Sequence, residues 1–300
     1  MPLKRVQGLI SHRMRERAFE LADAPCPVVV SESSFQQGEL QPLRTLRMLS
    51  FNIQVGITTQ QYGHYLTRSW QHLLPAASRQ KNLNRIAQLI RDYDLVGLQE
   101  VDGGSLRSGF VNQIEYLAEQ GRFPWWYQQL NRNLGQFAQH SNGLLSRCPP
   151  HSIEDHKLPG LIPGRGAIVA EFGEENPLLV VILHLALSRR GREYQLQYIR
   201  EVIDQYESVV LMGDMNAHTS ELLHNSPLEG AGLHNASQDV VTFPSWKPKK
   251  SLDHIFLSAS LRAIRAEVLP FPQSDHLPVA VEIELPSDIK IRRKTVPAIH

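Results

Sequence analysis

Two polar residues follow an apolar run in the second half of the chain. Residues 209–212 are all apolar, and Gly213, Asp214 and Asn216 come next. The run is typical of a strand that is buried on both faces. Side chains two residues apart on an extended chain project to the same side, so Asp214 and Asn216 can face one pocket. A carboxylate is costly at the end of a buried strand, so we take this pair as candidate functional residues.

Four further residues suggest the chemistry. Asn52 and Glu100 end apolar runs and offer oxygen ligands, which suit Mg²⁺ or Mn²⁺ better than a softer metal. A magnesium ion held by carboxylates can neutralise the charge that develops on a phosphate during in-line displacement. Asp275 and His276 can supply a base that is oriented by a carboxylate and accepts a proton from water near neutral pH. These residues therefore predict phosphoryl chemistry.

Alternating strands and helices are expected to position these side chains. Residues 46–53, 94–100, 178–183 and 209–213 have the pattern of strands, and apolar residues at helical spacing predict helices over 81–92 and 192–206. Each half of the chain thus contains a strand, a helix and a second strand that ends at a carboxylate. This order favours an α/β layer with the polar residues at the strand ends. Further strands are expected over 142–147, 164–172, 251–257 and 279–285, and a short helix over 112–120.

The aromatic cluster at residues 123–127 has two interpretations. Its Phe, Trp and Tyr side chains can stack on bases or lie near a lipid headgroup, or they can fill a core or an edge strand. We favour the second interpretation. His184 and His254 are likewise more often structural than active when each is considered alone.

Composition sets broad limits. The 300 residues include 42% hydrophobic and 20% charged residues, which is typical of a globular chain that forms one large α/β domain or two small ones. A formal net charge of +1 gives no overall signature of a nucleic-acid binder, although a local basic patch is compatible with it. Cys26 and Cys148 are far apart and predict neither a disulfide framework nor a thiolate zinc site.

The N-terminal 45 residues have the composition of an extension. Its Arg-rich part, around residues 13–17, is expected to be a solvated helix face, and contact with phosphate or an anionic surface is the alternative. These charges interrupt any signal-peptide core, and no apolar run approaches the roughly 20 residues of a membrane span. We expect a cytoplasmic protein.

Taken together, six short motifs resemble, in order, those of the endonuclease/exonuclease/phosphatase superfamily. They are Phe51-Asn52-Ile53, Leu98-Gln99-Glu100-Val101, Leu183-His184-Leu185, Gly213-Asp214-Met215-Asn216, Ser251-Leu252-Asp253-His254-Ile255 and Ser274-Asp275-His276-Leu277-Pro278-Val279. Residues 142–147 and 164–167 resemble further family segments, so the resemblance covers about residues 46–285.

This resemblance implies a fold and a domain organisation. The expected fold is a four-layered αββα sandwich of the α/β (α+β) class, in which two mixed β-sheets pack face to face between helices. The expected catalytic domain spans residues 46–286, with an N-terminal extension of residues 1–45 and a C-terminal tail of residues 287–300. The active site is expected where strand edges from both halves meet.

The resemblance also implies roles for individual residues. Glu100 is expected to be the main Mg²⁺ ligand with Asn52 beside it, and Mn²⁺ is expected to substitute. Asp275 is expected to orient His276 or to touch the metal. The remaining expectations are His276 as general base or phosphate stabiliser, Asp214 in water activation or leaving-group protonation, Asn216 and His184 as donors to the scissile phosphate, and Asp253 as the carboxylate that pairs with the histidine. His218 matches no family position.

Three departures from the family pattern bear on the substrate. Gln54 and His184 stand where abasic-site endonucleases tend to carry an acidic residue and a tyrosine, and Val101-Asp102 resembles the sphingomyelinase, inositol-phosphatase and deadenylase branches. DNA repair is therefore disfavoured. We expect a monomeric, Mg²⁺-dependent phosphodiesterase of nucleic acid or of a lipid or small-molecule phosphodiester. A phosphomonoesterase, or a non-catalytic binding module on the same fold, is the alternative.

Overall fold

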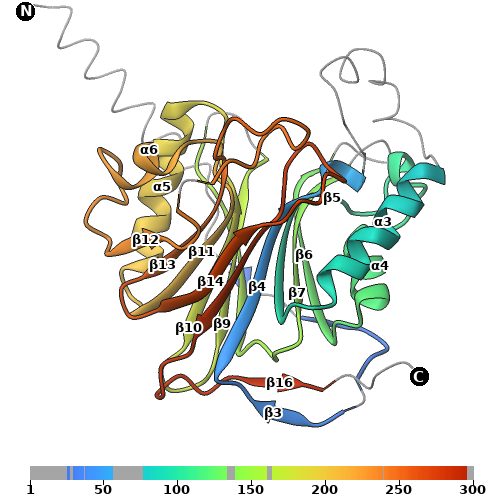
Figure 1. Cartoon of the computed structure of the whole chain (residues 1–300), viewed down its shortest axis with the longest axis horizontal. Helices are drawn as coiled ribbons and strands as arrows, with labels where there is room; N and C mark the ends of the chain where they lie inside the picture. Colours follow the sequence, from blue (N-terminus) through green and yellow to red (C-terminus); the bar gives the residue numbers. More distant parts are fainter. Residues whose placement is uncertain are drawn as a thin grey trace, which may run out of the picture.

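Two seven-stranded β-sheets pack face to face, and helices cover their outer surfaces (Figure 1). This architecture is seen in a computed structural model that describes residues 26–27, 30–36, 38–56, 77–133, 139–160, 164–238 and 240–295. The layers are helix, sheet, sheet and helix. The predicted αββα sandwich is thus confirmed.

The first sheet has the strand order β14-β15-β4-β5-β7-β6-β2. In that order the strands span Arg262–Val268, Val279–Glu284, Thr45–Asn52, Leu95–Asp102, Gln139–Ser146, Trp125–Asn133 and Ser31–Glu32. Helices α3 (Ala77–Ile90) and α4 (Gln113–Gly121) cover its outer face (Figure 1).

The second sheet has the order β1-β8-β9-β10-β11-β13-β12. In that order the strands span Cys26–Pro27, Ser152–Lys157, Gly166–Phe172, Leu178–His184, Ser208–Asp214, Asp253–Ser258 and Leu233–Asn235. Helices α5 (Arg189–Ile203) and α6 (Thr219–Leu223) lie on its outer face (Figure 1).

Burial on both faces explains the long apolar runs of the central strands. In β11, Val210 and Met212 belong to the core between the two sheets, whereas Val209 and Leu211 pack in the cluster that includes helix α5. Alternate side chains of one strand therefore enter two different cores. Every residue of β11 is buried, so Asp214 ends a strand that has no solvent-facing side.

Strand direction brings the polar strand ends together. The β4–β5 and β10–β11 pairs are parallel, and each pair is joined by one of the helices α3 and α5. Their carboxyl ends share the upper edge of the sandwich in Figure 1, where β4 continues into the 3₁₀-helix η1 (Gln54–Gly56). Strands β13 and β15 are antiparallel to β11 and β4, so they begin at this same edge. Six strands therefore contribute residues to one site.

The described parts of both terminal segments form strands, and β3 and β16 make a separate two-stranded sheet. Strand β1 pairs with β8, and β2 pairs with β6. Strand β3 (Leu40–Pro42) pairs with β16 (Arg292–Lys294), which lies beyond the predicted domain end at residue 286. The Arg-rich part of the N-terminal segment lies outside the described residues. The domain boundaries at 45/46 and 286/287 stay predictions.

The aromatic cluster is structural. Phe123 is fully buried in the core beneath α3 and α4, and Trp126 packs against that core. Trp125 lies opposite Ser146, the last residue of β7, whereas the residues of β7 near the site are at its beginning. The core or edge-strand interpretation is thus confirmed.

Strands β8 and β14 had no clear signal in the sequence. Among the described helices, none is long and apolar enough to cross a membrane.

Candidate active site

Asp214 lies at the centre of the polar edge, which is the edge of the sandwich where the carboxyl ends of β4, β5, β10 and β11 meet. The register of the second sheet places it between His184 on β10 and Asp253 on β13. His184 Nε2 is 3.4 Å from its Oδ2 atom, and His276 Nε2 is 3.7 Å from the same oxygen. Asn52 donates to this oxygen from β4 of the other sheet, at 3.1 Å. One carboxylate oxygen thus joins residues from both halves of the sandwich.

Gly213 explains how Asp214 reaches this position. Its φ of 151° lies in the region that favours glycine, and a Cβ atom there would be 1.9 Å from the carbonyl oxygen of Leu183. The neighbouring strand β10 therefore approaches too closely for any other residue. Just beyond the strand, Asn216 donates its backbone N–H to Asp214 Oδ1 at 3.0 Å and its side-chain Nδ2 to the Leu185 carbonyl at 3.0 Å.

A second carboxylate orients His276. The Nδ1 atom of His276 is 2.8 Å from Asp253 Oδ2, and both side chains are buried. Thr242 donates its hydroxyl to the same Asp253 oxygen at 2.5 Å. The Phe243 ring packs on the imidazole with a centroid distance of 4.9 Å. His276 therefore presents Nε2 towards Asp214 in a fixed orientation.

The charges of these two groups are coupled. Burial raises the pKa of Asp214 to about 7, with Asp253 adding repulsion and His276 acting in the opposite direction. Burial also opposes the charged form of His276, but the carboxylates of Asp253 and Asp214 outweigh it and hold the pKa of His276 well above its ordinary value. His276 is therefore an imidazolium at neutral pH, and Asp214 is a group that can exchange a proton there.

Glu100 occupies a different environment at the end of β5. Its φ of 54° is left-handed, and the ladder between β5 and β7 shifts register between Leu98 and Val101. This bulge turns Glu100 out of the strand, and its side chain is 33% exposed. Asn52 donates to Glu100 Oε1 at 3.2 Å, and His184 Nε2 is 4.0 Å from that atom. Burial and repulsion from Asp275 raise the pKa of Glu100.

Asp102 and Gln113 hold the backbone that directly follows the bulge. The buried Asp102 carboxylate accepts hydrogen bonds from the N–H groups of Gly104 and Ser105, at 2.9 and 2.7 Å, and from the hydroxyls of Ser105 and Ser108, at 2.7 and 2.8 Å. Gln113 accepts from the Asp102 N–H at 2.9 Å and donates to the Val55 carbonyl at 3.0 Å. A left-handed non-glycine residue persists only when its surroundings fix it, and these bonds fix the chain two residues after Glu100.

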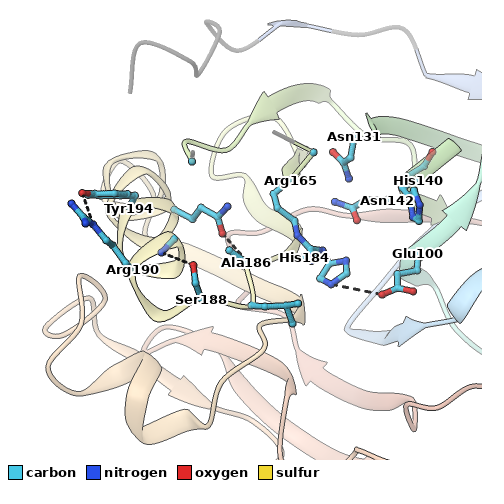
Figure 2. A pocket seen from close by; sticks show the side chains of 16 residues that line it. Glu100, Asn131, His140, Asn142, Arg165, His184, Ala186, Ser188, Arg190 and Tyr194 are labelled. Atoms are coloured by element: carbon cyan, nitrogen blue, oxygen red, sulfur yellow. Dashed lines mark hydrogen bonds and ion pairs between the residues drawn. The ribbon is translucent and has the colours of Figure 1, made fainter. Parts of the chain in front are cut away.

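His184 and Arg165 lie together beside the two carboxylates. Burial, with the positive charge of Arg165, lowers the pKa of His184 well below its ordinary value, so the imidazole is neutral. Burial lowers the pKa of Arg165, while Asp214 and Glu100 act in the opposite direction. Figure 2 shows the Arg165 side chain running towards His184 and Glu100 along the wall of a cavity.

The donor set at Glu100 fits a hard divalent cation. Glu100 is a partly exposed carboxylate with a raised pKa, and Asp275 adds a second negative charge close by. A bound cation would stabilise the ionised form of such a carboxylate, and cations that prefer oxygen ligands, such as Mg²⁺ or Mn²⁺, suit it best. In the assigned orientation, Asn52 turns Nδ2 towards Glu100, and its Oδ1 accepts from the Gln54 N–H at 3.1 Å. Asn52 would therefore ligate only after a turn of its amide, and otherwise it orients Glu100.

A second group has the composition of a metal site but suits it less well. Ligand atoms of Asp214, Asp253 and His276 all lie within 4.8 Å of one another. The neighbouring carboxylates hold the pKa of His276 well above its ordinary value, so a metal at this group would have to displace a proton from the imidazole. The Glu100 carboxylate is the better candidate.

Two histidines near the predicted site residues in the sequence, His254 and His218, lie apart from this cluster. His254 is fully buried, and its Nε2 is 2.8 Å from the Ala217 carbonyl on the α6 side of the second sheet. His218 is exposed at the N-cap of α6. Asp275 is buried, accepts from the Ser274 hydroxyl at 3.2 Å, and acts on Glu100 and His276 through its charge.

Several residues around the site were not predicted to take part in it. Thr242, Asp102 and Gln113 contribute only through contacts made in the fold. Arg165 stands at the beginning of a predicted strand, and its closeness to Glu100 follows from the pairing of the strands. The available clues were its place in the family-like segment of residues 164–167 and its position directly before β9.

The geometry suits a hydrolase site for phosphate esters, with a carboxylate that fits a cation beside an Asp–His–Asp group. The sequence profile of the Endonuclease/Exonuclease/phosphatase family matches residues 49–276, and the chain belongs to this family. By their description, its members are nucleases and phosphatases, enzymes that hydrolyse phosphate ester bonds. The resemblance found in the sequence motifs is thus confirmed, and the chain is a hydrolase of this type.

Solved structures support the fold. An endonuclease/exonuclease/phosphatase protein of Beutenbergia cavernae is similar with a TM-score of 0.62 at 20% identity, covering 81% of this chain and 72% of that one. A mannosyl-6-phosphatase of Bacteroides thetaiotaomicron gives 0.59 at 18% identity over 80% of this chain and all 100% of its own. A humanized D. rerio TDP2 gives 0.59 at 16% identity, covering 81% and 100%. No curated protein matches the sequence.

Proposed function

We propose that the chain is a Mg²⁺-dependent phosphodiesterase. The observation that carries this proposal is the junction at Asp214, where the partly exposed carboxylate of Glu100 and the His276–Asp253 pair meet across one edge of the sandwich. A cation and a proton acceptor are the two components that in-line hydrolysis of a phosphodiester requires. Mn²⁺ is expected to substitute for Mg²⁺, since it has the same preference for oxygen ligands.

The cation would be held by Glu100, with Asn52 beside it. When bound, it supplies charge neutralisation at the phosphate. Asp275 lies close enough to add negative charge to this side of the site. We propose that the main role of Asn52 is to keep Glu100 and Asp214 in place, because its Nδ2 atom donates to both carboxylates.

Asp214 would accept a proton from water, and His276 would donate a hydrogen bond to the phosphate. Asp214, with a pKa of about 7, is suited to accept a proton from the attacking water near neutral pH. His276 is protonated between two carboxylates, so its Nε2–H group can donate to a phosphate oxygen. Of the two roles that the resemblance offers for His276, stabiliser of the phosphate is the one that this charge state favours.

Two further residues would bind the scissile phosphate. His184 is neutral and can donate one hydrogen bond without adding charge. Asn216 stands at a left-handed position, with φ of 52°, and its amide is engaged by the Leu185 carbonyl. Its free donor hydrogen is available to the substrate. The cytoplasmic location and the monomeric state stay predictions from the sequence.

A substrate panel tests this proposal. Purified protein is assayed with bis-p-nitrophenyl phosphate, p-nitrophenyl phosphate, intact and abasic DNA, RNA and sphingomyelin, each with Mg²⁺ and with EDTA. We expect hydrolysis of at least one diester that EDTA abolishes and Mg²⁺ or Mn²⁺ restores. Hydrolysis of the monoester alone would replace the phosphodiesterase by a phosphomonoesterase, and activity that persists in EDTA would contradict the role of the metal.

A further inference from the structure

One large cavity opens beside the candidate active site. It has a volume of about 520 Å³, within the usual range for small-molecule sites. Glu100 and His184 lie at one end, and the beginning of helix α5 forms the other (Figure 2). A phosphate bound at Glu100 would therefore direct one of its substituents into this space. The charges that line the cavity should then decide which substituents are accepted.

Arg165 is the main positive charge in the cavity. Its guanidinium makes neither a hydrogen bond nor a close ion pair with any residue in the described part of the chain. Burial lowers its pKa, and the charges of Asp214 and Glu100 act in the opposite direction. Two other partly buried arginines are satisfied, since Arg147 donates to four backbone carbonyls and Arg293 to Asp94. A largely buried guanidinium without a partner is a ready site for an anion.

The backbone around Arg165 is held in place. The Arg165 carbonyl accepts from the Leu158 N–H at 3.1 Å, and the buried Asn142 donates to the Gly166 carbonyl at 3.0 Å. A Cβ atom at Gly166 would lie 2.3 Å from Asn131 Oδ1, so the chain packs closely here. The site therefore exists before any ligand arrives, which lowers the entropic cost of binding.

The rest of the lining adds positive rather than negative charge. Among the described residues that line the cavity, Glu100 is the only one with a carboxylate, and Arg190 adds a second guanidinium. Tyr194 has the kind of ring that binds quaternary ammonium groups, but the Arg190 guanidinium already lies over it, 5.8 Å from its centroid. A choline headgroup would thus meet positive charge and an occupied ring.

We propose that this cavity binds one substituent of the phosphoester and that Arg165 receives a second phosphate carried by that substituent. This assignment rests on the proposed function, because a phosphoester must first lie at Glu100. Under this proposal, substrates with two neighbouring phosphates are preferred to phosphodiesters of choline or ethanolamine. The second phosphate can belong to a small bisphosphate or to the next position of an oligonucleotide.

Binding tests this proposal without requiring turnover. With Mg²⁺ present, calorimetry compares thymidine 3′,5′-bisphosphate with thymidine 5′-monophosphate, and phosphocholine serves as the cationic probe. We expect the bisphosphate to bind at least about tenfold more tightly than the monophosphate, as is usual for one charge-assisted contact. Phosphocholine should bind more weakly than either. Equal binding of bisphosphate and monophosphate, or tighter binding of phosphocholine, would overturn the proposal.

Variants identify the residue. Arg165→Gln should abolish the preference for the bisphosphate, whereas Arg165→Lys should keep most of it and so controls for folding. Arg189→Gln is the matched control, because Arg189 is 74% exposed, pairs with Glu193 and does not line the cavity. An unchanged preference in Arg165→Gln, or a loss of equal size in Arg189→Gln, would refute the assignment to Arg165.

One more ligand separates the two sources of the second phosphate. The dinucleotide pTpT is compared with thymidine 3′,5′-bisphosphate on the wild-type protein. Tighter binding of pTpT supports an oligonucleotide, and equal binding supports a small bisphosphate. Because the measurement is of binding, a protein that hydrolyses no diester would contradict the proposed function and leave this result interpretable.

Discussion

The β4–α3–β5 unit and the β10–α5–β11 unit have the same architecture but end in carboxylates with different neighbours. Each unit has two parallel strands joined by a helix on the outer face. Glu100 ends the first beside an amide and is repelled by Asp275. Asp214 ends the second between two imidazoles, at 3.4 and 3.7 Å. The comparison teaches that the same supersecondary unit can place a carboxylate where it suits a cation or where it suits proton transfer. The difference lies in the side chains that the neighbouring strands place around the carboxylate.

The largest effect is expected on the proton side of this comparison. His276→Ala should lower kcat by about 10²- to 10⁴-fold on whichever diester the panel identifies, because it removes the donor that faces Asp214. The Mg²⁺ concentration for half-maximal activity should not change. His218→Ala is the control, since His218 is exposed on α6. Wild-type turnover in His276→Ala would contradict the proposed role of His276 as a donor to the phosphate.

The next effect concerns the cation side. Glu100→Gln keeps the size of the side chain but removes its charge, so the Mg²⁺ requirement should rise by at least tenfold while saturating Mg²⁺ restores much of kcat. Activity as a function of Mg²⁺ concentration measures this. Glu115→Gln, at an exposed position of α4, provides the comparison. If Glu100→Gln keeps the wild-type requirement, the cation is held elsewhere.

A smaller effect is expected from the residues that hold the Glu100 bulge. Asp102→Asn places an amide N–H group against the N–H donors of Gly104 and Ser105, so the bulge should loosen. The Mg²⁺ requirement should rise by about tenfold, as is usual for residues that orient a ligand. Ser108→Ala removes a single bond to Asp102 and should change it less. An unaltered requirement in Asp102→Asn would show that Glu100 does not need this support.

The smallest effect is on stability. Because the pKa of Asp214 is raised to about 7, its folded form binds a proton more tightly than the unfolded chain does. Its contribution to stability is therefore present at pH 4 and below and is lost as the pH rises through about 7. Without metal, Asp214→Asn should therefore raise Tm by a few degrees at pH 8 and by less at pH 5. A change of 1 kcal/mol in the free energy of unfolding corresponds to about 2–4 °C in Tm for a chain of this size.

Differential scanning calorimetry in EDTA at the two pH values makes this measurement. Glu174→Gln, at an exposed position, should leave Tm unchanged at both. A destabilised Asp214→Asn at pH 8 would mean that the ionised carboxylate is favourable in the fold, contrary to the proton role of this unit.

The sequence predicts the central strands and the main site residues for a physical reason. Apolar runs such as residues 209–212 must be buried on both faces, and a carboxylate at their end is visible because of its cost. Helices α3 and α5 follow from their periodicity, although both begin a few residues earlier than expected. The cluster at the strand ends then follows from the order of the parallel units.

What the sequence could not predict depends on contacts between distant segments. Strand β14 has an exposed or half-buried pattern along its whole length, so it lacks an apolar signal. The backbone after the Glu100 bulge is held by Asp102 and Gln113, and the sequence predicts this role for neither residue. The proton state of His276 depends on two carboxylates from β11 and β13, and no local pattern specifies their distances.

One measurement tests directly whether the cation is bound by the β4–α3–β5 unit and not by the β10–α5–β11 unit with His276. Mn²⁺ binding is measured by electron paramagnetic resonance of the free ion for the wild type, Glu100→Gln and His276→Ala, with no substrate present. We expect His276→Ala to bind Mn²⁺ as tightly as the wild type and Glu100→Gln to bind it at least tenfold more weakly. Loss of binding in His276→Ala, with wild-type affinity in Glu100→Gln, would contradict the account.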